Sequence, residues 1–318
     1  MKSIGGYFEL ELNDFGGIYH NKAIDVNTGR NAFEYILRSN KKLTKVLLPY
    51  FVCDVLLQPI KKLNLEVEFY GLDNAFLPKV NSVKKNEVIL YVNYFGIMNK
   101  NIKNISNRFE NIIIDNSQAF YANPIKNIPT FYSPRKFFGV ADGGFLYTGK
   151  RINAKLEKDN SLNRLSQLFG RIEKGAEAFY PLFKENERKL DNLPLMKMSN
   201  LTKKLMKNIN FEVVRQKRNE NFSFLHNALS KLNELTPIID KEKINGPMLY
   251  PFLRNGNEKL KKFLIKDRIY VATYWPNVFE WVNKTDWEYY LSENIIPLPI
   301  DQRYVPADLK FIIRLIKK

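Results

Sequence analysis

One lysine stands out among the residues of this chain that could do chemistry. Lys136 lies in the stretch TFYSPRKFFGVADGG, between an aromatic run and a pair of glycines. The next segment, FLYT, is apolar and aromatic enough to form a strand, so Lys136 is expected in a turn between two buried elements. Taken alone, a lysine among aromatic residues is more often a surface residue whose stem packs on apolar groups than a nucleophile.

A carboxylate upstream of this lysine changes the interpretation. The apolar run NIIID ends at Asp115, and Gln118 follows three residues later. In a parallel α/β sheet, ligands bind at the carboxyl ends of the strands. An aspartate at one strand end and a lysine at the exit of the next are the pair that pyridoxal 5'-phosphate (PLP) chemistry requires. The lysine forms an imine with the cofactor, and the carboxylate keeps the pyridine nitrogen protonated.

These segments resemble the motifs of a known family, the PLP-dependent aminotransferases of the DegT/DnrJ/EryC1/StrS group. Members of this group have fold type I and mostly act on keto-sugars attached to nucleotides. FYSPRKFFGVADGG matches the family's lysine segment, which has the form SFHPTKNITTGEGG, without a gap. The match places Lys136 on the imine lysine and Asp115 with Gln118 on the strand-end motif. By the resemblance, the ionised Asp115 keeps the ring nitrogen protonated and Gln118 supports the ring hydroxyl.

A turn near the start of the chain offers a site for an anion. In IDVNTGRNAFEY, a Thr-Gly pair ends a strand, and apolar residues then fall at helical spacing. A glycine just before a helix lets free backbone N–H groups face an anion, and the helix dipole adds to the attraction. NTGRNA resembles the family's SSGTAA segment, whose backbone holds the cofactor phosphate, which implies a cup of Gly29, Arg30 and Asn31. Arg30 replaces a small hydroxyl residue, and its side chain either contacts the phosphate or points away.

Other positions depart from the family pattern. Ser133 stands where the family often has histidine, and Phe131 replaces a serine that commonly contacts the phosphate. Ser133 either takes over that contact or merely ends a strand. A gapless match puts Cys53 where the family has the aromatic residue that stacks on the cofactor ring, with Phe51 two residues earlier. The family's Asn-aromatic-Arg signature, which reaches the neighbouring subunit's site, is not evident in DNLPLMKM.

The order of the predicted elements indicates the fold class. Short apolar runs alternate with helical ones, which implies parallel strands joined by right-handed crossovers. With the resemblance, this predicts an α/β fold-type-I PLP-transferase, with a mostly parallel sheet of the seven-stranded type flanked by helices. We expect residues 1–205 to form this PLP-binding large domain with an N-terminal arm, and residues 206–318 a smaller α+β domain. Within them we expect helices at 52–63, at 209–235 and from Pro306. We expect strands from Ile24 up to the break at Thr28 and Gly29, and at 46–48, 65–69, 87–93, 111–115, 145–148, 248–253 and 269–276.

Composition excludes several classes of protein. The chain has 318 residues, enough for two domains with a core, and no apolar run long enough to span a bilayer. Its first twenty residues do not resemble a signal peptide, and its single cysteine fits a reducing compartment, so we expect a cytoplasmic protein. With two histidines and no cysteine cluster, we expect no metal site of the usual type.

The net charge of +17 has two readings, a nucleic-acid interface or a solvated surface. The lysines are spread through the chain without a recognisable nucleic-acid module, which favours the second. The resemblance implies a homodimeric aminotransferase that moves an amino group from glutamate to a keto-sugar nucleotide, for surface polysaccharide or related sugar biosynthesis. Two alternatives are a PLP sugar dehydratase of the same fold, whose members typically replace the imine lysine with histidine, and a noncatalytic basic protein with a degenerated PLP site.

Overall fold

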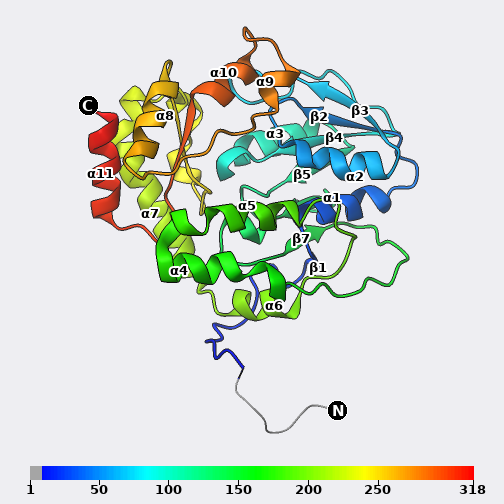
Figure 1. The fold of residues 1–318 in the computed structure, drawn as a ribbon. Coiled ribbons are helices and arrows are strands. Elements are labelled where there is room, and N and C mark those ends of the chain that lie inside the picture. The colour runs from blue at the N-terminus through cyan, green and yellow to red at the C-terminus, as the bar shows by residue number, and fades with distance from the viewer. Residues whose placement is uncertain (1–8) are drawn as a thin grey trace.

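The computed structural model describes residues 9–318, so the first residues of the predicted N-terminal arm lie outside it. A seven-stranded sheet in the order β1-β7-β6-β5-β4-β2-β3 organises the larger part of the chain (Figure 1). Five neighbouring strands run parallel: β2 (Lys45–Pro49), β3 (Glu66–Tyr70), β4 (Glu87–Val92), β5 (Ile112–Asp115) and β6 (Thr130–Tyr132). β7 (Gly144–Tyr147) is antiparallel to β6, and β1 (Ile24–Val26) is antiparallel to β7.

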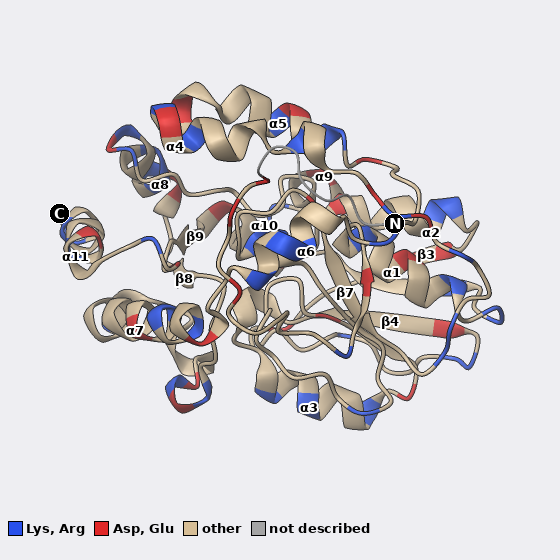
Figure 2. Ribbon diagram, turned by 90° about the horizontal axis from the view of Figure 1, so that it is seen from below, with Lys and Arg blue, Asp and Glu red and all other residues tan. Residues whose placement is uncertain are grey.

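Helices cover both faces of this sheet. Seen along the sheet, α3 (Asn99–Arg108) lies on one side, and α1 (Gly29–Arg38) and α2 (Leu57–Lys62) lie on the other (Figure 2). All residues of β4 and β5 are buried, as expected for central parallel strands with helices on both faces. α4 (Ser166–Ala178), α5 (Tyr180–Arg188) and α6 (Asn200–Lys207) follow β7. The sheet and its helices thus match the predicted fold class.

A smaller unit follows α6. The long helix α7 (Phe211–Leu229) leads into a two-stranded antiparallel sheet of β8 (Tyr250–Leu253) and β9 (Ile295–Leu298). The other helices of this unit are α8 (Asn257–Lys266), α9 (Val278–Trp281), α10 (Trp287–Asn294) and α11 (Pro306–Ile316). α7, α8 and α11 gather at the side of the molecule away from β2 and β3 (Figure 1). A division at residue 205 stays a prediction.

Three predicted elements differ from the structure. The helix expected at 209–235 is shorter, because α7 ends at Leu229 and a short 3-10 helix, Ser230–Leu232, follows it. The strand expected at 269–276 is wrong, because β8 pairs with β9 instead. Trp275 has a positive φ of 24° and sits edge-on against Phe51 at 4.6 Å between ring centres, so aromatic packing explains this apolar run. The helix expected from residue 52 begins later, with a short 3-10 helix at Asp54–Leu56 before α2. Pro59 has no N–H to donate, so it is tolerated in the first turn of a helix but not in its interior.

No helix within residues 9–318 is both long enough and apolar enough to cross a bilayer.

Candidate active site

Parallel pairing of β5 and β6 brings the predicted carboxylate and lysine to one edge of the sheet. Asp115 is the last residue of β5 and pairs with Phe131 on β6. β6 leads into Ser133 and a 3-10 helix, Pro134–Lys136, which places Lys136 just beyond the strand end. The Lys136 side chain is exposed, although its neighbours Pro134 and Phe137 are buried. Its charge acts on Asp115 and on Cys53, so the structure brings these three groups together.

The Asp115 carboxylate is buried with few polar partners. It is 6% exposed, and its Oδ1 accepts a hydrogen bond from the backbone N–H of Ser117 at 2.7 Å. Burial raises the pKa of Asp115, and the positive charge of Lys136 and the hydrogen bonds from Ser117 oppose that rise without cancelling it. A buried carboxylate whose pKa stays raised would gain from a further cation beside it. A protonated pyridine nitrogen is such a cation.

The N-terminus of α1 lies against the ends of β5 and β6. A Cβ built on Gly29 would lie 3.3 Å from Ser133 Cβ, and 3.7 Å from the hydroxyl oxygens of both Ser133 and Ser117. The first backbone N–H groups of a helix have no partner within it. Among the described hydrogen bonds, none uses the N–H groups of Gly29 or Arg30, whereas that of Asn31 donates to Thr28 Oγ1 at 3.0 Å. Two backbone donors and two hydroxyls thus form a small cup suited to a phosphate.

Ser117 is a part of this cup that the sequence did not single out. It lies within the matched strand-end motif, between Asp115 and Gln118, so the signal was present. For Ser133, the contact with Gly29 favours the phosphate role over that of a serine that merely ends a strand.

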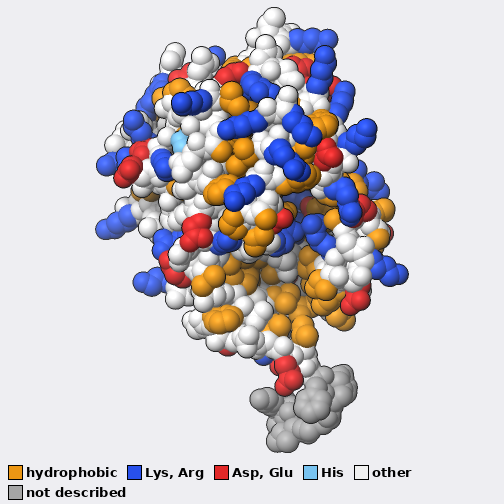
Figure 3. All heavy atoms as spheres, turned by 90° about the vertical axis from the view of Figure 1, so that its left-hand side faces the viewer, with side chains coloured by type: hydrophobic (Ala, Val, Ile, Leu, Met, Phe, Trp, Pro, Cys, Tyr) orange, Lys and Arg blue, Asp and Glu red, His pale blue; other side chains and the backbone are white. Residues whose placement is uncertain are grey.

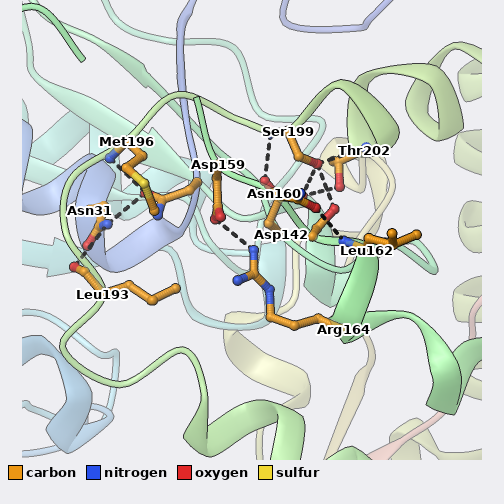
Figure 4. A network of polar contacts seen from close by, with 12 residues as sticks. Asn31, Asp142, Asp159, Asn160, Leu162, Arg164, Leu193, Met196, Ser199 and Thr202 are labelled. Carbon is orange, nitrogen blue, oxygen red and sulfur yellow. Dashed lines mark hydrogen bonds and ion pairs between the residues drawn. The ribbon is translucent and has the colours of Figure 1, made fainter. Parts of the chain in front are cut away.

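The side chains of Arg30 and Asn31 point away from the cup. Arg30 Nη1 lies 2.6 Å from Asp191 Oδ1 and 2.9 Å from Gln58 Oε1, so it pairs with the loop after α5. Asn31 Nδ2 donates to the carbonyl of Pro194 at 2.7 Å and to that of Leu193 at 3.3 Å, and Figure 4 shows Asn31 beside Leu193. Both donor groups of Asn31 are therefore used inside the protein, contrary to its predicted place in the cup. Arg30 contributes its backbone N–H and no charged contact.

Gln118 holds a strained turn beside the site. Its Oε1 accepts a hydrogen bond from the N–H of Phe95 at 2.6 Å, at the end of β4. Phe95 and Gly96 both have positive φ, 59° and 79°, and a Cβ on Gly96 would lie 2.6 Å from the Gln118 carbonyl oxygen. Only glycine fits there without displacing the strand ends. The side-chain amide nitrogen of Gln118 is the group left for a ligand, and its role toward a ring hydroxyl stays a prediction.

A thiol occupies the place where the family pattern has an aromatic residue. Phe51 is fully buried and stacks on Tyr94 at 5.6 Å between ring centres, so it belongs to the core. Cys53 is half-buried and within the electrostatic influence of Lys136 and Arg30. Burial raises the pKa of the Cys53 thiol, which keeps it uncharged at neutral pH. Of these two residues, the one at the site is Cys53.

The acidic-Gly-Gly ending of the lysine motif, Asp142 to Gly144, has a structural role. Asp142 is fully buried and accepts hydrogen bonds from Ser199 N at 2.8 Å, Ser199 Oγ at 2.7 Å and the hydroxyl of Thr202, all at the start of α6 (Figure 4). A Cβ on Gly144 would lie 2.3 Å from the Thr28 carbonyl oxygen, so glycine lets β7 approach the turn before α1. The contacts of Asp142 and Gly144 therefore support the cup, and the Asp142 carboxylate does not face a ligand.

The charged residues do not concentrate at one face of the molecule. Lys and Arg occur on helices at opposite sides of the ribbon (Figure 2), and over the face formed by α7, α8 and α11 they alternate with hydrophobic side chains (Figure 3). No cluster of three or more possible metal-ligating side chains occurs in residues 9–318. His20 is buried, and its Nε2 lies 2.8 Å from the Phe120 carbonyl oxygen, where it donates a hydrogen bond.

Comparisons with known proteins identify the fold. No family model matches this sequence, and no curated protein matches it either. Among solved structures, an aminotransferase of the DegT/DnrJ/EryC1/StrS group from Brucella abortus matches with a TM-score of 0.64 and 16% identity, over 94% of this chain and 86% of that one. A Helicobacter pylori aminotransferase involved in the biosynthesis of pseudoaminic acid matches with a TM-score of 0.62 and 12% identity, over 93% and 85%.

A third match is the PLP form of a candidate sugar aminotransferase from Streptococcus pneumoniae. Its TM-score is 0.61 at 14% identity, over 93% of this chain and 86% of that one. At these identities the likeness is one of fold, and it confirms the predicted fold class. The Brucella abortus structure is described as a member of the group whose motifs the sequence resembles.

Proposed function

We propose that this chain is a PLP-dependent aminotransferase of the DegT/DnrJ/EryC1/StrS type. The observation that carries the proposal is the meeting of Lys136, Asp115 and the cup at the start of α1 on one edge of the sheet. These groups come from three separate segments, so their proximity does not follow from any one motif. The neighbours of the same fold support the proposal, because all three are described as aminotransferases and one of them is in its PLP form.

The residues present fit the cofactor at both of its charged ends. The cup offers two free backbone N–H groups and the hydroxyls of Ser133 and Ser117 to the phosphate. At the other end, the buried carboxylate of Asp115 lacks a bonded cation and would hold a proton on the pyridine nitrogen. Between them, Lys136 is exposed and able to reach a ligand.

Each of these groups has a task in the proposed reaction. PLP, when bound, supplies a ring that accepts electrons and so stabilises negative charge on the carbon next to the transferred nitrogen. Lys136 would hold the cofactor through Nζ and, once released, hold or move the proton at that nitrogen. Asp115 must stay ionised to keep its partner protonated, and the paired positive charge offsets the penalty of burial. The side-chain amide of Gln118 would donate to the ring hydroxyl.

The finer parts of the proposal concern the substrates and the assembly. We propose glutamate as the amino donor and a keto-sugar nucleotide as the acceptor, made for surface polysaccharide or a related sugar. The net charge of +17 supports an anionic substrate, because a positive field raises the rate at which anions reach a site. A homodimer is proposed on the grounds of the resemblance alone, and a cytoplasmic location because the single cysteine fits a reducing compartment.

One experiment tests the reaction class. The purified protein is incubated with PLP, its visible absorbance is recorded, and borohydride reduction with peptide mapping locates the attached cofactor. We expect a visible band that changes when glutamate is added, and a reduced adduct on Lys136. Lys136→Ala should lose both, whereas Lys126→Ala, which changes a lysine outside the proposed site, should keep them.

Other results would favour the alternatives. A band without any amino transfer to keto-sugar nucleotides, but with loss of a sugar hydroxyl, would favour the dehydratase. Neither band nor adduct in the wild type, together with nucleic-acid binding that weakens steeply with salt, would favour a basic binding protein.

A further inference from the structure

A buried arginine lies behind the turn that carries the lysine. Arg218 on α7 is 2% exposed, and its guanidinium carbon lies 4.6 Å from the centre of the Phe137 ring. Phe137 directly follows Lys136 in the chain. A buried guanidinium is costly unless its N–H groups are bonded, and an apolar residue of similar volume would fill the same space. Packing alone does not explain an arginine at this place.

The partners of Arg218 are backbone carbonyls from two separate segments. Its Nη2 donates to the carbonyl of Phe137 at 3.3 Å, and its Nη1 donates to those of Pro247 at 3.1 Å and Met248 at 3.0 Å. Within residues 9–318 these neutral acceptors make the direct contacts of the guanidinium, the charge of Asp301 acts on it without a described ion pair, and Nε is buried without a partner. Burial lowers the pKa of Arg218 to about 10, so the side chain stays charged at neutral pH.

These bonds connect the lysine turn to the segment that enters β8. The Phe137 carbonyl also accepts a hydrogen bond from Gln302 Nε2 at 3.1 Å, which lies between β9 and α11. On the other side, the N–H of Met248 donates to the Phe95 carbonyl at 2.9 Å, in the turn that Gln118 holds. Arg218 thus lies at the centre of a chain of contacts between two strand ends of the large sheet and the smaller unit.

The planar guanidinium suits this task better than other side chains. It presents several N–H donors in fixed directions, so one residue can hold carbonyls from different segments at fixed relative positions. A lysine would place one charge at one point, and a methionine would donate nothing. The contact with the Phe137 ring adds a cation–π attraction on the same residue.

We propose that Arg218 is a positioning residue that fixes the Lys136 turn, through the Phe137 carbonyl, to the segment entering the smaller unit. It does not touch the substrate or the reacting atoms. The inference rests on the proposed function in one respect, that Lys136 is the reacting group. The contacts themselves are independent of any cofactor.

The first test uses the cofactor-free protein and amide hydrogen exchange. The N–H groups of Phe137 and Phe138 both donate to the Pro134 carbonyl at 2.9 Å, so their exchange reports on the lysine turn. We expect Arg218→Met to speed this exchange by about tenfold or more, because the turn loses a bond to a charged donor. The exchange rate in Arg218→Lys should lie between the rates in Arg218→Met and in the wild type. Lys217→Met, at the neighbouring position on α7, should match the wild type, since none of the described hydrogen bonds or ion pairs involves the Lys217 side chain.

The second test uses the protein loaded with PLP. We expect Arg218→Met to shift the pH at which the visible band of lysine-bound PLP is half lost. We also expect kcat to fall about tenfold, with the KM for glutamate changed less than about twofold. A role in stability alone would lower the melting temperature and leave the pH profile unchanged.

The outcomes separate the two proposals. A wild type without a visible band refutes the proposed function, while the exchange test still decides the role of Arg218. A folded Arg218→Met variant with wild-type exchange and a wild-type pH profile overturns the inference. If Arg218→Met does not fold, Arg218→Lys and Gln302→Leu decide it by the same readouts, since Gln302→Leu removes the second donor to the Phe137 carbonyl.

Discussion

One buried histidine contributes to the acid sensitivity of this protein. His20 is 3% exposed and lies among the rings of Tyr19, Phe120, Tyr132 and Phe145. Burial lowers its pKa from an ordinary value of 6.5 to about 4, because the charged imidazolium loses its water. The folded state therefore binds its proton at a lower pH than the unfolded state does.

The direction and the size of the effect follow from linkage. Above pH 6.5 the imidazole is neutral in both states and costs nothing. Between pH 6.5 and 4 the unfolded chain binds a proton that the folded chain does not, so the free energy of unfolding decreases as the pH falls. At pH 4.5 the loss from His20 amounts to about 2–3 kcal/mol.

The assay is urea unfolding of the wild type and of His20→Gln at pH 7.5 and pH 4.5. Glutamine keeps a donor for the Phe120 carbonyl and an acceptor for the Tyr147 hydroxyl, but does not titrate. The wild type should lose about 2–3 kcal/mol more than His20→Gln between the two pH values. His226→Gln is the matched control. Its loss of unfolding free energy between the two pH values should differ less from that of the wild type, because His226 is only half-buried. Equal losses in the wild type and His20→Gln would refute the reasoning.

Three further substitutions test the site and its supports. The Asp115→Asn variant should still attach PLP to Lys136. Its single-turnover amino transfer should be slower by roughly 10²- to 10³-fold, as expected for loss of a preorganised charge. An unchanged rate would exclude the carboxylate from the chemistry. Ser133→Ala should weaken PLP binding by roughly tenfold to a hundredfold in a spectroscopic titration, through loss of one hydrogen bond to a charged phosphate, whereas equal affinity would remove Ser133 from the cup. Gly96→Ala should destabilise the fold by about 2 kcal/mol or more in thermal unfolding. The reason is that the alanine Cβ would lie 2.6 Å from the Gln118 carbonyl oxygen, at a φ of 79°. A wild-type melting temperature would contradict that geometry.

The sequence by itself determined the features that depend on short stretches of chain. The run NIIID predicts a buried parallel strand that ends at Asp115, and the apolar segments around SPRK predict a turn that carries Lys136. The structure has both, as β5 and the 3-10 helix Pro134–Lys136. Once these strands are parallel neighbours, their exits must share an edge, so the proximity of the two groups was also predictable.

The tertiary structure alone decided where individual side chains point. Arg30 faces Asp191, 161 positions along the chain, and Asn31 faces Pro194, 163 positions along. Arg218 meets Phe137 across 81 positions. No periodicity or local motif encodes such pairings, because the partner is set by how whole elements pack.

The same reason explains the wrong strand at 269–276. Its alternation of apolar and polar residues is a local signal, but a strand needs a partner, and Ile295–Leu298 pairs with β8 instead. Likewise, Phe51 and Cys53 are equal candidates in sequence for the ring-stacking place, and only the packing of Phe51 on Tyr94 and Trp275 removes it from the site. Local patterns determine which elements form, and long-range packing determines which of their side chains are free to act.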